Sequence, residues 1–303
     1  MQASMLTAVL MPIALAVITL GLGLSLTRAD FARVLVYPRA VVIGIVCQTL
    51  LLPAVGFFIA RGFHLSPELA VGLMLLAASP GGPSANLFSH LARGDVALNI
   101  TLTAVNAVLS LLTLPLIVNS SLAHFMTGDR AVSMQPGKVA QVFVVVLVPV
   151  AIGMFVRARR PALARRLERP VRILSAVFLV AVIVGAVLKE RAGVISALQQ
   201  VGLAALLFNL TSMAVGYFLP LLARLPERQA VAIGMEIGIH NGTLAITIAS
   251  SPTLLASPTM AIPPAIYSLI MFLTAGAFSF VMSRRLRDAA PDPLPPRAGG
   301  ETS

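Results

Sequence analysis

The sequence predicts an all-α membrane protein that crosses the bilayer about nine times, and two observations lead to this fold class. Of the 303 residues, 58% are hydrophobic and 11% are charged, whereas soluble domains are about 45–50% apolar and about 25% charged. Apolar runs also recur along nearly the whole chain, and about 20 apolar residues in a helix cross a hydrocarbon core of about 30 Å. Spanning helices, and not a soluble core, therefore organise the chain.

Charged residues and Pro or Gly clusters divide the sequence into nine apolar segments. We expect spans at residues 5–26, 39–63, 67–91, 95–122, 138–158, 170–188, 194–223, 227–251 and 259–283. The first segment is followed, not preceded, by basic residues, unlike a signal peptide, so we interpret it as a retained span. Residues 1–287 then form one transporter domain, and residues 288–303 are expected to be a disordered tail.

The distribution of basic residues predicts an orientation. Nine alternating spans place seventeen of the 22 Lys and Arg residues on one side and five on the other. The positive-inside rule then puts the N-terminus outside and the C-terminus in the cytoplasm, for a multi-pass protein of the inner (plasma) membrane. The net charge of +11 does not indicate nucleic-acid binding, because the basic residues form short clusters without aromatic platforms. The Arg-rich loop 157–172 could alternatively bind anionic lipid headgroups.

Two of the nine spans carry residues that interrupt a helix. The third contains SPGGPSAN at residues 79–86, and the eighth contains GIHNGT at residues 238–243. Broken spans at corresponding positions of two halves indicate the binding site of a transporter. The two spans are five apart, which favours inverted repeats of four and five spans over residues 5–122 and 138–284. The alternative is that the glycines only permit close helix packing.

Glu236 is the only acidic residue that lies deep inside a predicted span. An unpaired charge at that depth costs at least about 3 kcal/mol, so we expect a partner. A cation held by carboxylate, amide, hydroxyl and freed backbone oxygens would satisfy it, and such an oxygen-rich site suits Na⁺. The alternative is a protonated carboxylic acid with a structural role. The single cysteine, Cys47, has no partner for a disulfide.

Other polar residues in the spans are candidate ligands. Asn99, Thr103 and Asn106 follow the first break and are spaced to share one helical face, and Asn86 lies within the break motif. Together with Gln48 in the second span, they could bind the ion or substrate, or could form ordinary bonds between helices. His240 could be a proton acceptor, a neutral ligand or a structural histidine. Neither an HExxH zinc motif nor a Walker loop is present.

SPGGPSANLFSHLARGDVALNITLTAV at residues 79–105 and EIGIHNGTLAI at residues 236–246 resemble the bile acid:sodium symporter family, as a bacterial member, over nearly the whole chain. The resemblance implies a panel domain and a core domain of inverted repeats. Two broken helices would cross near mid-membrane, with two Na⁺ sites behind the crossing. Many members have ten spans, and this chain would lack the first of them.

The resemblance also implies the ligands of both Na⁺ sites. The first would use Asn86, Asn99, Thr103 and Glu236, with Ala85 where a serine hydroxyl is often found. The second would use Gln48, Glu236, the backbone carbonyls of Ile237 and Ile239, and His240 at a position often occupied by glutamine. Because histidine has no amide oxygen, one-Na⁺ coupling and proton coupling through His240 both stay open.

The implied substrate is an organic anion, either bile-acid-like or a small carboxylate, bound near Asn241, Pro83 and Asn106. The implied function is secondary active symport by alternating access and not an enzymatic activity, with Na⁺ and the lipid bilayer as the other partners. The oligomeric state stays open. Two other hypotheses are an intramembrane enzyme that uses Glu236 and His240 as acid and base, and a non-transporting sensor.

Overall fold

The computed structural model describes residues 5–82, 84–126, 136–167, 169–171, 173–174, 177, 191–251 and 254–287. Within these residues the chain is helical, with no strand beyond one isolated bridge, which confirms the all-α prediction. Four helical stretches in the same part of the chain are long and apolar enough to cross a membrane: 38–62, 96–125, 198–222 and 259–285. The predicted sixth span and the tail fall largely outside the described residues.

The other predicted spans coincide with helices. Uninterrupted helices are α1 (Met5–Ser25), α7 (Val96–Phe125), α8 (Pro136–Arg159), α10 (Arg191–Leu222) and α13 (Ile262–Arg285), the last preceded by the 3-10 turn η4 (Thr259–Ala261). The second span consists of α3 (Pro38–Val46), a π turn η2 (Cys47–Leu51) and α4 (Leu52–Gly62). The third and eighth spans are broken, as α5 (Pro67–Ala78) with α6 (Ser84–Leu91), and α11 (Glu227–Gly238) with α12 (Gly242–Ser250).

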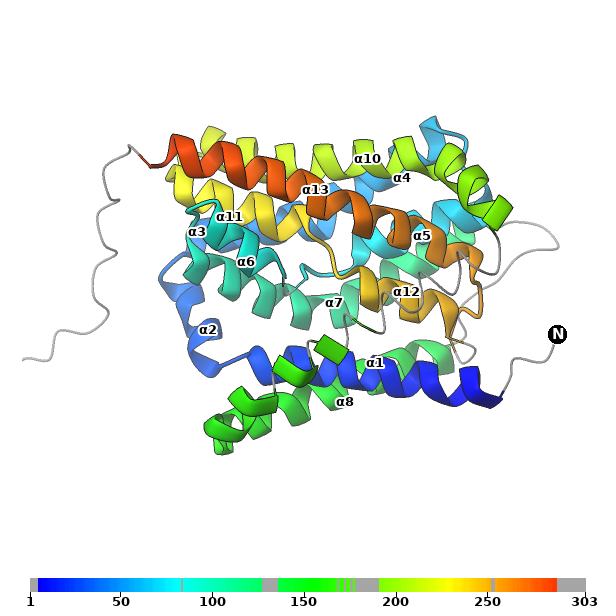
Figure 1. Ribbon diagram of the computed structural model, residues 1–303, viewed down its shortest axis with the longest axis horizontal. Coiled ribbons are helices and arrows are strands. Elements are labelled where there is room, and N and C mark those ends of the chain that lie inside the picture. Colours follow the sequence, from blue (N-terminus) through cyan, green and yellow to red (C-terminus); the bar gives the residue numbers. More distant parts are fainter. Residues whose placement is uncertain are drawn as a thin grey trace, which may run out of the picture.

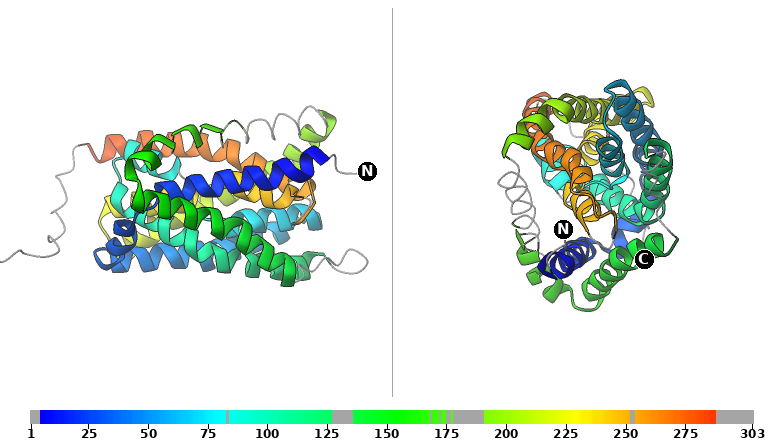
Figure 2. Two further views of the ribbon diagram at one scale, coloured as in Figure 1. Left: turned by 90° about the horizontal axis from the view of Figure 1, so that it is seen from below. Right: turned by 90° about the vertical axis from the view of Figure 1, so that its right-hand side faces the viewer.

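Helices α1 and α8 lie side by side along one edge of the molecule, beside the remaining helices (Figures 1 and 2). Their close approach depends on glycine, because a Cβ at Gly23 would meet the backbone of Val150 and a Cβ at Gly153 would meet the backbone of Leu20. Small residues allow such close contacts between helices in membranes. The two helices therefore form a tightly packed pair.

A short helix, α2 (Arg28–Ala32), and the 3-10 turn η1 (Arg33–Leu35) connect α1 to α3. Thr27 and Asp30 form a capping box at the start of α2. Although the sequence places Asp30 in a loop, its side chain is buried. Its charge is balanced by Arg33, whose Nη1 lies 2.6 Å from Oδ1 of Asp30.

The π turn in the second span has a cause in the sequence. Pro53 has no N–H and its ring would crowd the carbonyl four residues earlier. The Leu52 N–H instead bonds the Cys47 carbonyl, five residues back. The wider turn buries Gln48, and π turns are frequent at functional sites.

Both interruptions follow from local sequence. Ser79 precedes a proline, which disfavours helical backbone, and it has an extended conformation with φ −73° and ψ 140°. Helix α11 ends at Gly238, and the Asn241 side chain caps α12 by accepting a hydrogen bond of 3.0 Å from the Leu244 N–H. A proline interrupts the third span and a glycine followed by an asparagine cap interrupts the eighth, and each span is divided into two helices.

The two interruptions lie against each other in antiparallel directions. The Gly82 N–H donates to the Ile239 carbonyl at 2.8 Å, and the Asn241 N–H donates to the Pro80 carbonyl at 2.9 Å. In Figure 1, α5 and α12 extend from this point toward one end of the molecule, and α6 and α11 toward the other. The prediction of two broken, crossing helices is thus confirmed.

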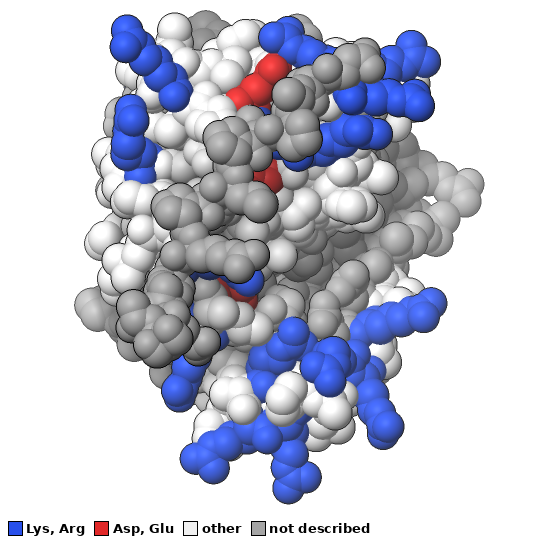
Figure 3. Space-filling model, turned by 90° about the vertical axis from the view of Figure 1, so that its left-hand side faces the viewer, with Lys and Arg blue, Asp and Glu red and all other residues white. Residues whose placement is uncertain are grey.

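Basic side chains gather at the end of the molecule where α2 lies and α13 finishes (Figure 3). At this end Glu227 accepts a hydrogen bond from Tyr217 and pairs with Arg285, whose Nε lies 2.7 Å from Oε1 of Glu227. The contacts join α10, α11 and α13.

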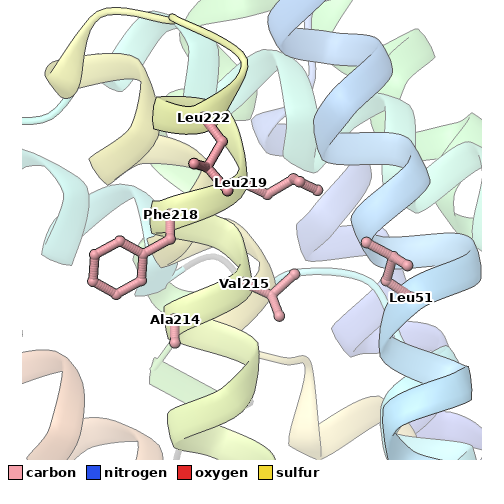
Figure 4. Close-up of a pocket in the computed structure, with 6 residues that line it drawn as sticks. All are labelled: Leu51, Ala214, Val215, Phe218, Leu219 and Leu222. Atoms are coloured by element: carbon pink, nitrogen blue, oxygen red, sulfur yellow. The ribbon is translucent and has the colours of Figure 1, made fainter.

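A surface groove of about 370 Å³ runs between α10 and the η2–α4 segment. Its lining is apolar (Figure 4): Leu51, Ala214, Val215, Phe218, Leu219 and Leu222. The groove does not include the polar residues of the crossing.

Candidate ion and substrate site

Glu236 lies at the crossing with no exposed surface. The Thr103 hydroxyl donates to Oε2 of Glu236 at 2.6 Å, and Nδ2 of Asn106 donates to Oε1 at 3.3 Å. A Cβ at Gly81 would collide with the same carboxylate. The structure therefore brings together α7, α11 and the α5–α6 break around one buried acid.

The polar face predicted for the fourth span is present on α7. Asn99, Thr103 and Asn106 are all buried. Asn99 faces α11 as well, where its Nδ2 donates to the Ala232 carbonyl at 2.7 Å. The spacing of the three residues thus identified a face that contacts α11 over two helical turns.

Several buried amide oxygens near the crossing lack a hydrogen-bond partner among the described residues. They are Oδ1 of Asn86, Oδ1 of Asn99, Oδ1 of Asn106 and Oε1 of Gln48. Leaving such an atom unsatisfied costs about 1–3 kcal/mol, so a ligand that these oxygens could bind would relieve a real penalty. Asn86 lies in α6, just after the first break.

Gln48 and His240 converge on a single backbone oxygen. Nε2 of Gln48 donates to the Ser79 carbonyl at 2.9 Å, and Nδ1 of His240 lies 3.1 Å from the same oxygen. Since a carbonyl can only accept, Nδ1 carries the proton. In the neutral ring Nε2 is then a free acceptor, and it has no partner among the described residues.

The His240 ring is held by two aromatic side chains. It stacks on Phe208, with ring centroids 5.7 Å apart and an interplanar angle of 19°, and it meets Tyr267 edge-on with centroids 5.4 Å apart. The hydrogen bonds of Glu236 go to α7, whereas that of His240 goes to Ser79. The two residues therefore do not form the acid–base pair that the enzyme hypothesis requires.

Of the remaining predicted site residues, Asn241, Ile237 and Ile239 lie at the α11–α12 break. Asn241 is buried at the crossing, with its Oδ1 engaged in capping α12. The Ile237 side chain is buried, and the Ile239 carbonyl accepts the hydrogen bond from Gly82. Pro83 lies outside the described residues.

Three residues that the sequence did not single out belong to the same region. Asn209 of α10 and Tyr267 of α13 both donate to the Gly238 carbonyl, at 3.0 and 2.8 Å. Thr274 of α13 donates to Oδ1 of Asn209 at 2.6 Å. A lone asparagine inside the apolar segment LLFNLTSM was the available signal.

No three His, Cys, Asp or Glu side chains among the described residues lie close enough to hold a metal ion. A cation at this crossing would therefore be bound by the Glu236 carboxylate together with amide, hydroxyl and backbone oxygens. This donor set suits a hard cation.

A polytopic α-helical membrane protein with two interrupted helices crossing at a buried carboxylate has the architecture of a secondary transporter. Residues 12–198 match the Sodium Bile acid symporter family. The chain belongs to that family, and it is a membrane transport protein, not an enzyme.

Individual relatives align over most of the chain. An uncharacterized sodium-dependent transporter of Bacillus subtilis, YocS, is 26% identical over 274 residues, covering 90% of this chain and 83% of the relative. A probable sodium/metabolite cotransporter of Arabidopsis thaliana chloroplasts, BASS1, is 27% identical over 281 residues, covering 91% and 68%. The ileal sodium/bile acid cotransporter of Oryctolagus cuniculus is 26% identical over 246 residues, covering 81% and 70%.

Proposed function

We propose that this protein is a secondary active transporter that couples Na⁺ to the movement of an organic anion by alternating access. The observation that carries the proposal is the fully buried Glu236 carboxylate at a crossing where several buried amide oxygens have no partner among the described residues. Both its oxygens accept hydrogen bonds, from Thr103 and Asn106, as an ionised carboxylate does. A bound cation would balance that charge.

The first ion site consists of Glu236, Thr103, Asn86 and Asn99. Thr103 and Asn99 lie one helical turn apart on α7, and no described residue donates to the Asn99 amide oxygen. Sodium is the proposed ion because these donors are oxygens, because the site has one carboxylate, and because relatives are named as sodium-dependent transporters. The second site consists of Gln48, Glu236, His240 and the Ile237 and Ile239 carbonyls.

The organic anion is proposed to bind where α6 and α12 begin. The first turn of a helix has unpaired N–H groups and a partial positive charge, so two helix starts at one crossing attract an anion without a buried Lys or Arg. Asn241, Pro83 and Asn106 are the proposed contacts, and the substrate is either bile-acid-like or a small carboxylate.

Ion binding and substrate binding are linked through the crossing. A cation that joins α7, α11 and the α5–α6 break stabilises one arrangement of both interruptions, and the anion binds that arrangement better. Alternating access is proposed to occur by movement relative to the α1–α8 pair, as panel against core. The orientation proposed from the basic residues places the N-terminus outside and the C-terminus in the cytoplasm.

A screen on the purified full-length protein tests the proposal. Thermal unfolding is measured in NaCl and KCl, at two pH values, with bile salts and small carboxylates including keto acids and pantoate. We expect Na⁺ to raise the unfolding temperature, K⁺ not to do so, and one class of anion to add stability only with Na⁺. Equal stabilisation by Na⁺ and K⁺ would count against a sodium site.

One observation favours proton coupling as a second candidate. Nε2 of His240 is buried and has no hydrogen-bond partner in the described part of the chain, and a nitrogen acceptor can take a proton where an amide oxygen cannot. Anion uptake into proteoliposomes driven by a pH gradient without Na⁺ would establish this alternative.

A further inference from the structure

The Gly238 carbonyl is hydrogen-bonded by side chains of α10 and α13, which are not part of either interrupted span. It belongs to the last turn of α11, where carbonyls lack partners within the helix. It accepts two hydrogen bonds from two other helices, from Nδ2 of Asn209 at 3.0 Å and from the Tyr267 hydroxyl at 2.8 Å. Both donors have no exposed surface.

Thr274 contacts the other end of the Asn209 amide. Its hydroxyl donates to Oδ1 of Asn209 at 2.6 Å. Because the Gly238 carbonyl can only accept, the NH₂ group of Asn209 faces it and Oδ1 faces Thr274, which removes the usual ambiguity between the two ends of an amide. Thr274, Asn209 and the Gly238 carbonyl thus form a directed chain of hydrogen bonds.

The next carbonyl along the chain bonds a different segment. The Ile239 oxygen accepts from the Gly82 N–H, on the α5–α6 break, whereas the Gly238 oxygen faces α10 and α13. The backbone permits this change because Ile239 has left the helix, with φ −115° and ψ 89°. The hydrogen bonds at the Gly238 and Ile239 carbonyls thus hold the two peptide planes on either side of Ile239.

Tyr267 acts on a second group beside this carbonyl. Its ring meets His240 edge-on, while the His240 Nδ1 is bound to Ser79. One residue of α13 thus contacts both the Gly238 carbonyl and the His240 ring, on either side of Ile239. A shift of Tyr267 would move an imidazole and a backbone oxygen together.

We propose that Asn209, Tyr267 and Thr274 are positioning residues for cation binding, which hold the Gly238 carbonyl outward so that the Ile239 carbonyl faces the bound ion. The inference rests on the proposed function, because it assumes that a cation binds at the crossing. None of the three residues touches the ion in this account. Their effect is on how strongly the protein binds Na⁺.

The test is a Na⁺ titration of thermal unfolding, with KCl keeping ionic strength constant, for Tyr267→Phe and Thr274→Val. Each removes one hydroxyl. Losing one neutral hydrogen bond weakens an interaction by about two- to tenfold, so the Na⁺ concentration for half-maximal stabilisation should rise about three- to tenfold. Tyr217→Phe is the matched control. It also removes a buried tyrosine hydroxyl between α10 and α11, but one that donates to Glu227 and not to Gly238. The Na⁺ concentration for half-maximal stabilisation of this variant should stay at the wild-type value.

Thr103→Val is titrated beside these variants to separate two failures. If it loses the Na⁺ response while Tyr267→Phe and Thr274→Val titrate as the wild type, the ion site stands and the positioning role is wrong. If it also titrates as the wild type, the proposed ion site itself is wrong. Should Tyr267→Phe fail to fold, Thr274→Val alone decides, because Asn209 and Tyr267 remain and only the hydroxyl at Oδ1 of Asn209 is removed.

Discussion

Thr103 on α7 donates a hydrogen bond of 2.6 Å to Oε2 of Glu236 on α11, across 133 positions of sequence. The same hydroxyl lies 3.0 Å from the Asn99 carbonyl on its own helix. Thr103 therefore fixes the buried carboxylate relative to the polar face of α7. Neither residue is exposed enough for bulk water to substitute for the bond.

Thr103→Val should weaken Na⁺ binding. A hydrogen bond to a charged group contributes about 1.5–3 kcal/mol, which corresponds to about a 10- to 100-fold rise in the half-saturating Na⁺ concentration. Isothermal titration with NaCl measures it. Thr101→Val is the control, because Thr101 is equally buried on α7 but donates only to Ala97 on its own helix; equal losses in both variants would mean that the effect comes from α7 and not from Glu236.

Gly81→Ala should disrupt the same site from the other broken helix. The new Cβ would collide with the Glu236 carboxylate, and neither the buried acid nor the paired backbone can move away freely. We expect the affinity for Na⁺, measured from Na⁺-dependent thermal stabilisation, to fall at least about tenfold. Gly276→Ala adds a methyl where no atom lies within 4 Å and should titrate normally. A normal titration for Gly81→Ala would show that its backbone can shift without affecting the site.

His240→Gln should strengthen the second ion site. The substitution replaces a nitrogen acceptor by an amide oxygen, which is the better ligand for Na⁺. Gln48, which shares the Ser79 carbonyl with His240, has an Oε1 with no partner among the residues described. The Hill coefficient of Na⁺-stimulated anion uptake should rise above the wild-type value. An unchanged coefficient together with loss of pH-gradient-driven uptake would instead support proton coupling through His240.

The sequence predicted much of this fold because the relevant signals are local. Proline and glycine determine where the third and eighth spans break, and the spacing of Asn99, Thr103 and Asn106 determines a shared face of α7. Each signal depends on neighbours within two helical turns. The structure has both features where the sequence placed them.

The contacts between distant segments were not predictable from the sequence. Glu236 was expected to need a partner, but nothing local distinguishes Thr103 and Asn106, which bind it, from Asn99, which binds Ala232. Asn209 and Tyr267 gave still less signal, because their common acceptor is a backbone carbonyl on another helix. Asp30 is similar: a loop position by sequence, it is buried because Arg33 and Thr27 satisfy its carboxylate.

Glu236→Gln tests most directly whether the Glu236 charge binds the coupling ion. Glutamine keeps the size and polarity of the side chain and removes the charge, so the fold should persist. Thermal unfolding of both proteins in NaCl against KCl is the measurement. We predict that Na⁺ raises the unfolding temperature of the wild type but does not raise that of Glu236→Gln above its value in K⁺. An equal Na⁺-specific rise in the two proteins would contradict ion binding by Glu236.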